Sequence, residues 1–278
     1  MTSSIRVELL VLRKRMATWI LLGVWVILAA IFAYIVPYML NRSGATPQET
    51  ELIRQLMPDR FAGNVSSGFP FYGGAFAIML GVLAIGSDYT WGTLKTLFTQ
   101  GPGRLRIFAS KIIAIAITLI PFVLVPFIIG ATSSAIVASL EGNAMSWPSI
   151  ATIGQAILSS WGIMLAWAAF GVALAALTRG TSLAIGVGIL YTLALEGLLS
   201  ALAGSVNLLE PLVKIFVRTN AYSLIEPLGA MNAGSAGDGP GRFTGPFVST
   251  TQALIMLGVY VVVFVGVAGL ALRRRDVG

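Results

Sequence analysis

Six long stretches of apolar residues constrain this chain more than any other feature of its sequence. The first covers residues 17–37, and no charged residue lies between Ala17 and Val36. The other five cover residues 70–86, 112–139, 150–178, 181–203 and 249–271. A helix of roughly 20 apolar residues crosses the hydrocarbon core of a bilayer, because each residue adds about 1.5 Å. The sequence therefore predicts an all-α, multi-pass membrane protein with six transmembrane helices in a single domain, residues 1–278.

The composition excludes several classes of chemistry. Only 10% of the 278 residues are charged, whereas soluble domains have about 25%. The sequence contains no cysteine and no histidine, so disulfides, thiolate catalysis and histidine-based acid–base or metal chemistry are excluded. We therefore predict no catalytic residue and no metal site in this chain.

The distribution of cations predicts the orientation of the chain. Arginine and lysine gather before the first span, between the second and third, between the fourth and fifth, and after the sixth: Arg6, Arg13, Lys14, Arg15, Lys95, Arg104, Arg106, Lys111, Arg179, Arg273, Arg274 and Arg275. Loops rich in lysine and arginine stay in the cytoplasm. Both termini are thus predicted to be cytoplasmic. Because most of the net charge of +7 reflects this bias, we expect no nucleic-acid partner.

Residues 2–16 precede the first span and predict an amphipathic helix. Ile5, Leu9, Leu12 and Met16 share one helical face, and the cations lie away from it. One interpretation is an interfacial helix lying on the inner leaflet. The other is a cationic leader that only fixes the topology.

Two segments on the outer side are predicted to be short helices. Thr46, Pro47 and Glu49 have the spacing of a capping box, and Pro58 ends the helix. This helix, 46–58, is either a lid or a packed connector. Residues 207–231 alternate apolar and charged residues and predict re-entrant or interfacial helices before the sixth span. The Gly-rich residues 232–246 predict a loop.

Residues 87–111, SDYTWGTLKTLFTQGPGRLRIFASK, interrupt the apolar pattern on the cytoplasmic side. Ser87 or Asp88 is a candidate helix cap, and apolar residues then recur at spacings of three and four until Gly101-Pro102. This pattern predicts a cytoplasmic amphipathic helix over residues 88–100. Three cations after it, Arg104, Arg106 and Lys111, are predicted to anchor the third span at the lipid headgroups. The phosphate-loop motif G-x-x-x-x-G-K-[ST] is absent from the sequence, so nucleotide hydrolysis by that route is excluded.

The same stretch resembles the signature of ABC-2-type ABC transporter permeases. The resemblance rests on an acid, a Gly-Thr-Leu run, a leucine, a proline and two cations at matching spacings: Asp88, Gly92, Thr93, Leu94, Leu97, Pro102, Arg104 and Lys111. In that family this stretch is the coupling helix, which docks on a separate ATPase subunit. The resemblance implies that the contact is made by Asp88, Tyr89, Trp91, Gly92, Thr93, Leu94, Lys95, Leu97, Phe98 and Arg104. Residues 2–16 resemble the connecting helix of the family. Gly103 departs from the serine common at that position.

The resemblance implies a permease subunit of a bacterial inner-membrane ABC transporter. Such subunits export hydrophobic or amphiphilic compounds of the drug or antibiotic type. ATP and Mg²⁺ would bind two copies of a partner ATPase, so the chain itself would not be an enzyme. A second permease subunit, identical or related, would complete the pathway. On pattern alone, the helix 88–100 is equally explained as an amphipathic helix resting on lipid.

Three residues inside the fifth span are further candidates. Glu196 is the one acid within a predicted span, and intramembrane carboxylates usually face a bundle interior or a wet cavity. It either lines the substrate path or pairs with Lys214 or Arg218 near the outer interface. The competing hypothesis, a carrier or channel independent of ATP, would use Glu196 as a proton or cation site. Ala184 and Gly188 allow close helix contact, either with a second permease or within one chain.

Overall fold

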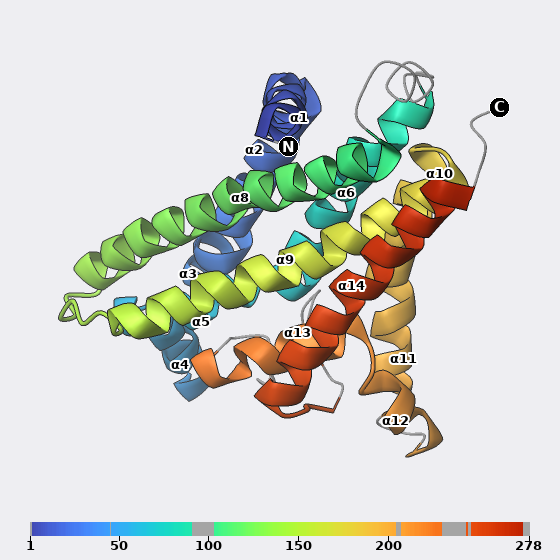
Figure 1. Ribbon diagram of the computed structural model, residues 1–278. Helices are drawn as coiled ribbons and strands as arrows, with labels where there is room; N and C mark the ends of the chain where they lie inside the picture. Colours follow the sequence, from blue (N-terminus) through green and yellow to red (C-terminus); the bar gives the residue numbers. More distant parts are fainter. Residues whose placement is uncertain are drawn as a thin grey trace.

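The computed structural model describes residues 2–44, 46–90, 103–203, 207–229, 243 and 246–274, and every regular element in them is a helix (Figure 1). Six helical segments are long and apolar enough to cross a membrane: Met16–Asn41, Pro58–Asp88, Leu105–Leu140, Ile150–Thr178, Ser182–Ser200 and Thr250–Arg273. Each predicted apolar stretch lies on one of these segments. The all-α fold with six candidate spans is thus confirmed.

The first two spans are each assembled from several helical pieces. The first span consists of α2 (Met16–Ala30), the π-helix η1 (Ile31–Ile35) and α3 (Val36–Asn41), and α1 (Thr2–Lys14) precedes it. The second consists of η2 (Pro58–Arg60), α5 (Phe61–Ser66), the π-helix η3 (Phe69–Gly73) and α6 (Gly74–Thr90). The second span therefore begins well before the predicted residue 70. The early part of this span contains polar residues and glycine, so its hydropathy did not indicate a span. All of α5 is nevertheless buried.

The third span is one helix, α8 (Arg104–Leu140), although it contains Pro121 and Pro126. Proline has no N–H, so Pro126 leaves the carbonyl of Phe122 without its helical partner. The buried indole of Trp25 on α2 compensates, because its Nε1 donates to this oxygen at 2.9 Å. Trp25 is therefore a packing residue of the core.

The core lies between α6 and α9 (Ile150–Thr178), which approach each other at backbone distance. A Cβ atom on Gly81 would lie 2.2 Å from the Ala168 carbonyl oxygen, and one on Gly171 would lie 2.3 Å from that of Ile78. Only glycine fits such a contact. We call these four residues the α6–α9 seam. Glycine at these positions of the second and fourth spans thus serves close helix packing.

The fifth span consists of α10 (Ser182–Ile189), the π-helix η4 (Leu190–Leu195) and α11 (Glu196–Ala203). Ala184 and Gly188 on α10 are fully buried, and a Cβ on Gly188 would lie 2.6 Å from the Ile78 side chain. These residues therefore pack within one chain. The predicted dimer contact through them is wrong, because a second chain cannot reach buried atoms.

The remaining helices lie at the end of the molecule opposite α1 (Figure 1). They are α4 (Pro47–Gln55), η5 (Asn207–Leu209), α12 (Glu210–Val213), α13 (Val217–Ile225) and η6 (Glu226–Leu228). The Thr46 hydroxyl accepts from the amide of Glu49 at 3.2 Å, which confirms the predicted cap. All nine residues of α13 are buried. The predicted loop 232–246 lies outside the described residues except for 243 and 246.

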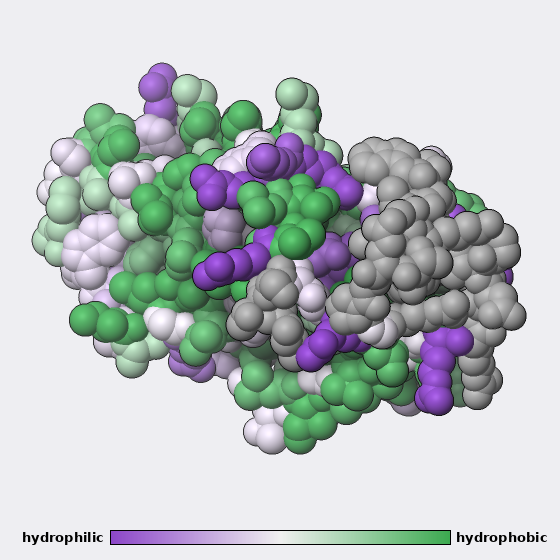
Figure 2. Space-filling model, turned by 45° about the horizontal axis from the view of Figure 1, so that its top comes forward, coloured by the Kyte–Doolittle hydropathy of each residue, from purple (hydrophilic) through white to green (hydrophobic). Residues whose placement is uncertain are grey.

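The termini of the described chain lie at one end of the molecule. Figure 1 shows α1 and the last turn of α14 (Thr250–Arg274) at the same end, together with the end of α6 and the start of α8. Figure 2 views this end, where hydrophilic side chains gather over the middle and hydrophobic side chains surround them. This arrangement agrees with the prediction that both termini share one side of the membrane.

Candidate functional site

The candidate site is the corner where α1, the end of α6 and the start of α8 meet, which we call the inner corner. α6 ends at Thr90 and α8 begins at Arg104. The predicted coupling residues between them, Trp91, Gly92, Thr93, Leu94, Lys95, Leu97 and Phe98, lie outside the described residues. The two helix ends that flank this segment, the end of α6 and the start of α8, both lie in the inner corner, and we call them its roots.

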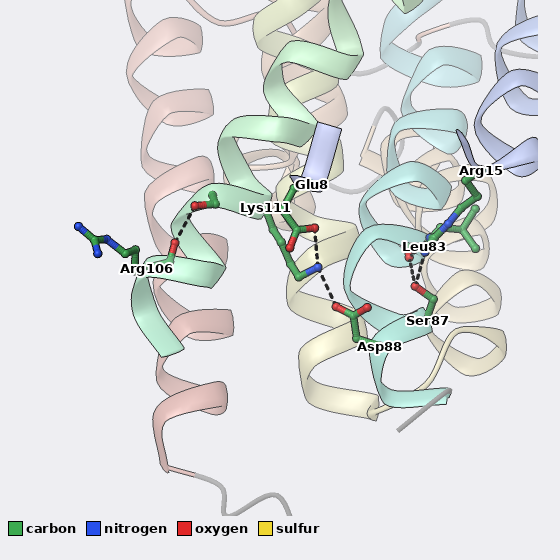
Figure 3. A network of polar contacts seen from close by, with 8 residues as sticks. Glu8, Arg15, Leu83, Ser87, Asp88, Arg106 and Lys111 are labelled. Atoms are coloured by element: carbon green, nitrogen blue, oxygen red, sulfur yellow. Dashed lines mark hydrogen bonds and ion pairs between the residues drawn. The ribbon is translucent and has the colours of Figure 1, made fainter. Parts of the chain in front are cut away.

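A buried ion triad joins the three helices of the inner corner (Figure 3). The ammonium of Lys111 on α8 lies 2.7 Å from Glu8 Oε2 on α1 and 2.8 Å from Asp88 Oδ2 on α6. The three side chains are only 7%, 11% and 13% exposed for Lys111, Glu8 and Asp88, respectively. One cation thus holds two carboxylates from helices that are distant in the sequence.

Burial explains why these charges are found together. Taking a single ammonium or carboxylate out of water costs several kcal/mol, and only close partners offset that cost. Lys111 was predicted to reach the headgroups, but its side chain is buried and engaged in the triad. That prediction is wrong for Lys111, whereas Arg106 is exposed as expected.

A second tie connects the first span to the end of α6. The guanidinium of Arg15, between α1 and α2, donates to the carbonyl of Leu83 and, at 2.8 Å, to the Ser87 hydroxyl (Figure 3). Ser87 Oγ also donates to the Leu83 carbonyl at 2.7 Å. The last two turns of α6 are therefore tied to α1 through Lys111 and to the α1–α2 junction through Arg15.

The structure corrects the predicted start of the coupling helix. α6 continues through Ser87, Asp88 and Tyr89 to Thr90, so neither Ser87 nor Asp88 caps a new helix there. Their side chains bind Arg15 and Lys111 instead. Arg104 is the first residue of α8 and follows Gly103, the first described residue after the segment 91–102.

Glu8 is a site residue that the sequence analysis missed. It lies on the face of α1 that packs on α8, together with Leu12, which is also buried. The face predicted to lie on the inner leaflet is thus turned toward the protein, apart from Met16, which is exposed. The only sequence signal was an acid placed one turn from Leu12 on the apolar face.

Glu196 lies at the opposite end of the molecule and holds α13. Its Oε1 accepts from the amide of Val217 at 3.2 Å, and its Oε2 accepts from that of Arg218 at 3.1 Å. These amides belong to the first turn of α13, whose N–H groups have no helical partner. The predicted pairing with Lys214 is wrong, because Lys214 pairs with Glu210 at 2.6 Å. The Arg218 guanidinium stacks on Phe71 at 4.7 Å.

Comparison with known protein families decides the identity. A family model described as "ABC-2 family transporter protein" matches residues 5–277, nearly the whole chain. The chain belongs to the ABC-2 transporter family. It is therefore a multi-pass ABC transporter permease, a transport subunit and not itself an enzyme. No curated protein matches this permease.

The permease also has an apolar cleft inside its membrane region. It lies between the first span, the start of the second and α8, with walls that include Trp25, Phe32, Tyr72 and Gly130. Its volume is about 50 Å³. Pockets for drug-sized ligands measure about 300–1,000 Å³. This cleft alone cannot enclose such a compound.

Proposed function

We propose that this permease drives the export of a hydrophobic or amphiphilic compound, of the drug or antibiotic type, with a separate ATPase subunit. ATP and Mg²⁺ would bind two copies of that ATPase. Binding of ATP would bring these subunits together and move the segment between α6 and α8. The motion would switch the pathway between inward and outward access in a bacterial inner membrane.

The inner corner is the observation that carries this proposal. A coupling element must pass a displacement to the spans. It can do so only if its two roots stay fixed relative to each other. Asp88 and Lys111, one at each root, are paired at 2.8 Å in a buried place. The two roots therefore move as one unit. Tyr89 and Arg104 are proposed, with the undescribed Trp91, Gly92, Thr93, Leu94, Lys95, Leu97 and Phe98, to contact the ATPase, whereas the Asp88 side chain is buried against Lys111 and supports the contact from inside.

A second permease chain would complete the cargo path. The apolar cleft beside Trp25 is too small for a drug-sized compound, and we place the path between two chains. The first, fifth and sixth spans have faces available for this contact, because only 11%, 22% and 22% of their apolar stretches are buried, and we propose the first and fifth. On this part of the fifth span, the exposed large apolar residues are Leu183 and Val187 of α10 and Leu190 of η4, and these replace Ala184 and Gly188 as candidates for the contact.

A carrier independent of ATP would instead use Glu196 as a proton or cation site. Both carboxylate oxygens accept backbone amides of α13, and the residue is completely buried. This geometry favours a structural cap over an exchange site. Whether Glu196 also lines a substrate path stays a prediction.

The test is co-purification of an ATPase with the tagged permease, followed by ATP hydrolysis of the complex. We expect the reference chain to retain an ATPase. The double variant Trp91→Ala with Gly92→Pro should lose it, or lose its stimulation of hydrolysis by at least about tenfold, because aromatic anchors often dominate an interface. The control is Trp147→Ala, which lies beyond the far end of α8 and contacts Phe61.

The outcomes separate the proposals. Loss in the double variant with retention in the control supports the assignment of the coupling helix. If no ATPase binds the reference chain, the proposal of ATP-driven export is wrong, and the result favours a carrier independent of ATP. If the double variant keeps both binding and stimulation, the coupling contact lies elsewhere.

A further inference from the structure

We propose that α1 is a moving part of the coupling apparatus: the Glu8–Lys111–Asp88 triad and Arg15 carry the displacement of the segment between α6 and α8 to α1 and on to the first span. The inference rests on the proposed function, since it needs an ATPase that moves this segment. It gives Glu8 the role of a positioning residue, which acts through Lys111 without touching cargo or nucleotide.

The first step runs from the segment to α1. Lys111 bonds Asp88 and Glu8 with the same ammonium, at 2.8 and 2.7 Å. A displacement of either root therefore changes the position of the cation that holds α1. Leu9 and Leu12 pack against the core from α1, so α1 is held by apolar packing as well as by the ion pair of Glu8 with Lys111.

The second step runs from α1 to the first span. The backbone at Arg15 is extended, with φ −76° and ψ 117°. This single residue interrupts the helix and separates α1 from α2. Its guanidinium holds the Leu83 carbonyl and the Ser87 hydroxyl in the last turns of α6. The junction is thus a corner fixed to α6, and a movement of α6 is passed to the beginning of α2.

The third step concerns the freedom of the first span to respond. Only 11% of its apolar stretch is buried inside the chain, compared with 72% for the second span. Lateral packing therefore restrains α2 far less than it restrains α6. Within one chain the first span is therefore freer to follow a displacement at the Arg15 corner than the second span, and its main tie to α8 is the Trp25 indole.

The charges of the triad make the proposal testable without unfolding the protein. Two carboxylates face one ammonium, so the variant Glu8→Gln leaves a balanced pair, Lys111 with Asp88. The roots stay joined to each other, while the ionic tie to α1 is lost. The control Glu210→Gln removes an acid from a half-exposed ion pair at the opposite end of the molecule.

The experiment labels α1 and follows it in the permease–ATPase complex in lipid nanodiscs. The permease has no cysteine, so Val7→Cys gives one attachment point for an environment-sensitive fluorophore before the complex is assembled. Val7 is 56% exposed on α1. Ile255→Cys, on the exposed side of α14, is the reference label. Fluorescence is recorded with and without Mg²⁺ and a non-hydrolysable ATP analogue.

We expect the nucleotide to change the signal at the Val7 position and not at the Ile255 position. In Glu8→Gln this change should fall at least about fivefold, while ATPase co-purification stays at the reference level and Glu210→Gln keeps the full change. A full change in Glu8→Gln, or no change in the reference complex with nucleotide bound, overturns the inference alone. Absence of any bound ATPase overturns the proposed function and the inference with it.

Discussion

The α6–α9 seam and the inner corner are both buried, yet they are held together by different forces. At the seam, Gly81 and Gly171 bring two backbones into contact, and no atom can be added between them. At the inner corner, three helices meet through charged side chains on Glu8, Asp88 and Lys111. Close packing depends on contact at a single distance, whereas an ion pair tolerates small displacements of its flexible side chains.

This difference divides the permease into a fixed part and a movable part. The seam joins the second and fourth spans, whose apolar stretches are 72% and 61% buried. The inner corner joins the second and third spans to α1 and to the first span, whose apolar stretch is only 11% buried. A transporter needs both kinds of contact, because some helices must move while the others hold their positions.

The largest effect is expected at the seam. Gly171→Leu would place a side chain against the Ile78 carbonyl, 2.3 Å from the new Cβ, and should lower the free energy of unfolding by at least about 3 kcal/mol. The readout is the yield of monodisperse protein and its unfolding in detergent. Gly162→Leu is the matched control on the same helix, since a Cβ there has open space. Equal behaviour of the two variants would refute the seam as a close contact.

The next largest effect is expected at Lys111. Lys111→Met leaves two buried carboxylates without their cation, which should cost about 3–5 kcal/mol of unfolding free energy. A triple variant with Glu8→Gln and Asp88→Asn removes all three charges and should recover most of the loss. Denaturant titration in detergent measures both. A triple variant as unstable as Lys111→Met would show that charge does not hold the corner.

A smaller effect is expected where Glu196 caps α13. Glu196→Gln replaces one acceptor oxygen with an NH2 group, which donates and cannot accept from the amide of Val217 or Arg218. The expected loss is about 1–2 kcal/mol, in the range for a helix cap. The same titration measures it, and faster hydrogen exchange in α13 should accompany it. Unchanged exchange in α13 would contradict the cap.

The smallest effect is expected at Glu210. Its ion pair with Lys214 is within one helical turn, and both side chains are more than 40% exposed. Glu210→Gln should change the free energy of unfolding by less than about 0.5 kcal/mol. A cost similar to that of Lys111→Met would mean that burial does not distinguish the two sites.

The six spans and the outer helix cap could be predicted because each depends on neighbouring residues. Apolar length identifies a span, and Thr46 with Glu49 identifies a helix start. The triad could not be predicted, because Glu8 and Lys111 are 103 residues apart and nothing local pairs them. For the same reason Ala184 and Gly188 indicated a close helix contact without showing which helix would make it.

The polar residues at the beginning of the second span show another limit. Asn64, Ser66 and Ser67 precede the predicted start at residue 70, yet they belong to this span and are buried. Hydropathy treats every span as facing lipid, whereas this one faces protein. Asn64 donates to the Ala33 carbonyl at 3.0 Å and Ser67 to the Asn64 carbonyl at 2.6 Å, which offsets the cost of their burial.

The most direct test of this division is hydrogen–deuterium exchange of the permease–ATPase complex, with and without a non-hydrolysable ATP analogue. A movable inner corner on a fixed seam predicts that the analogue changes exchange in α1 and at the end of α6, while the middle of α9 around Gly171 stays protected. Changes of similar size along α9, or none in α1 when nucleotide is bound, would contradict it.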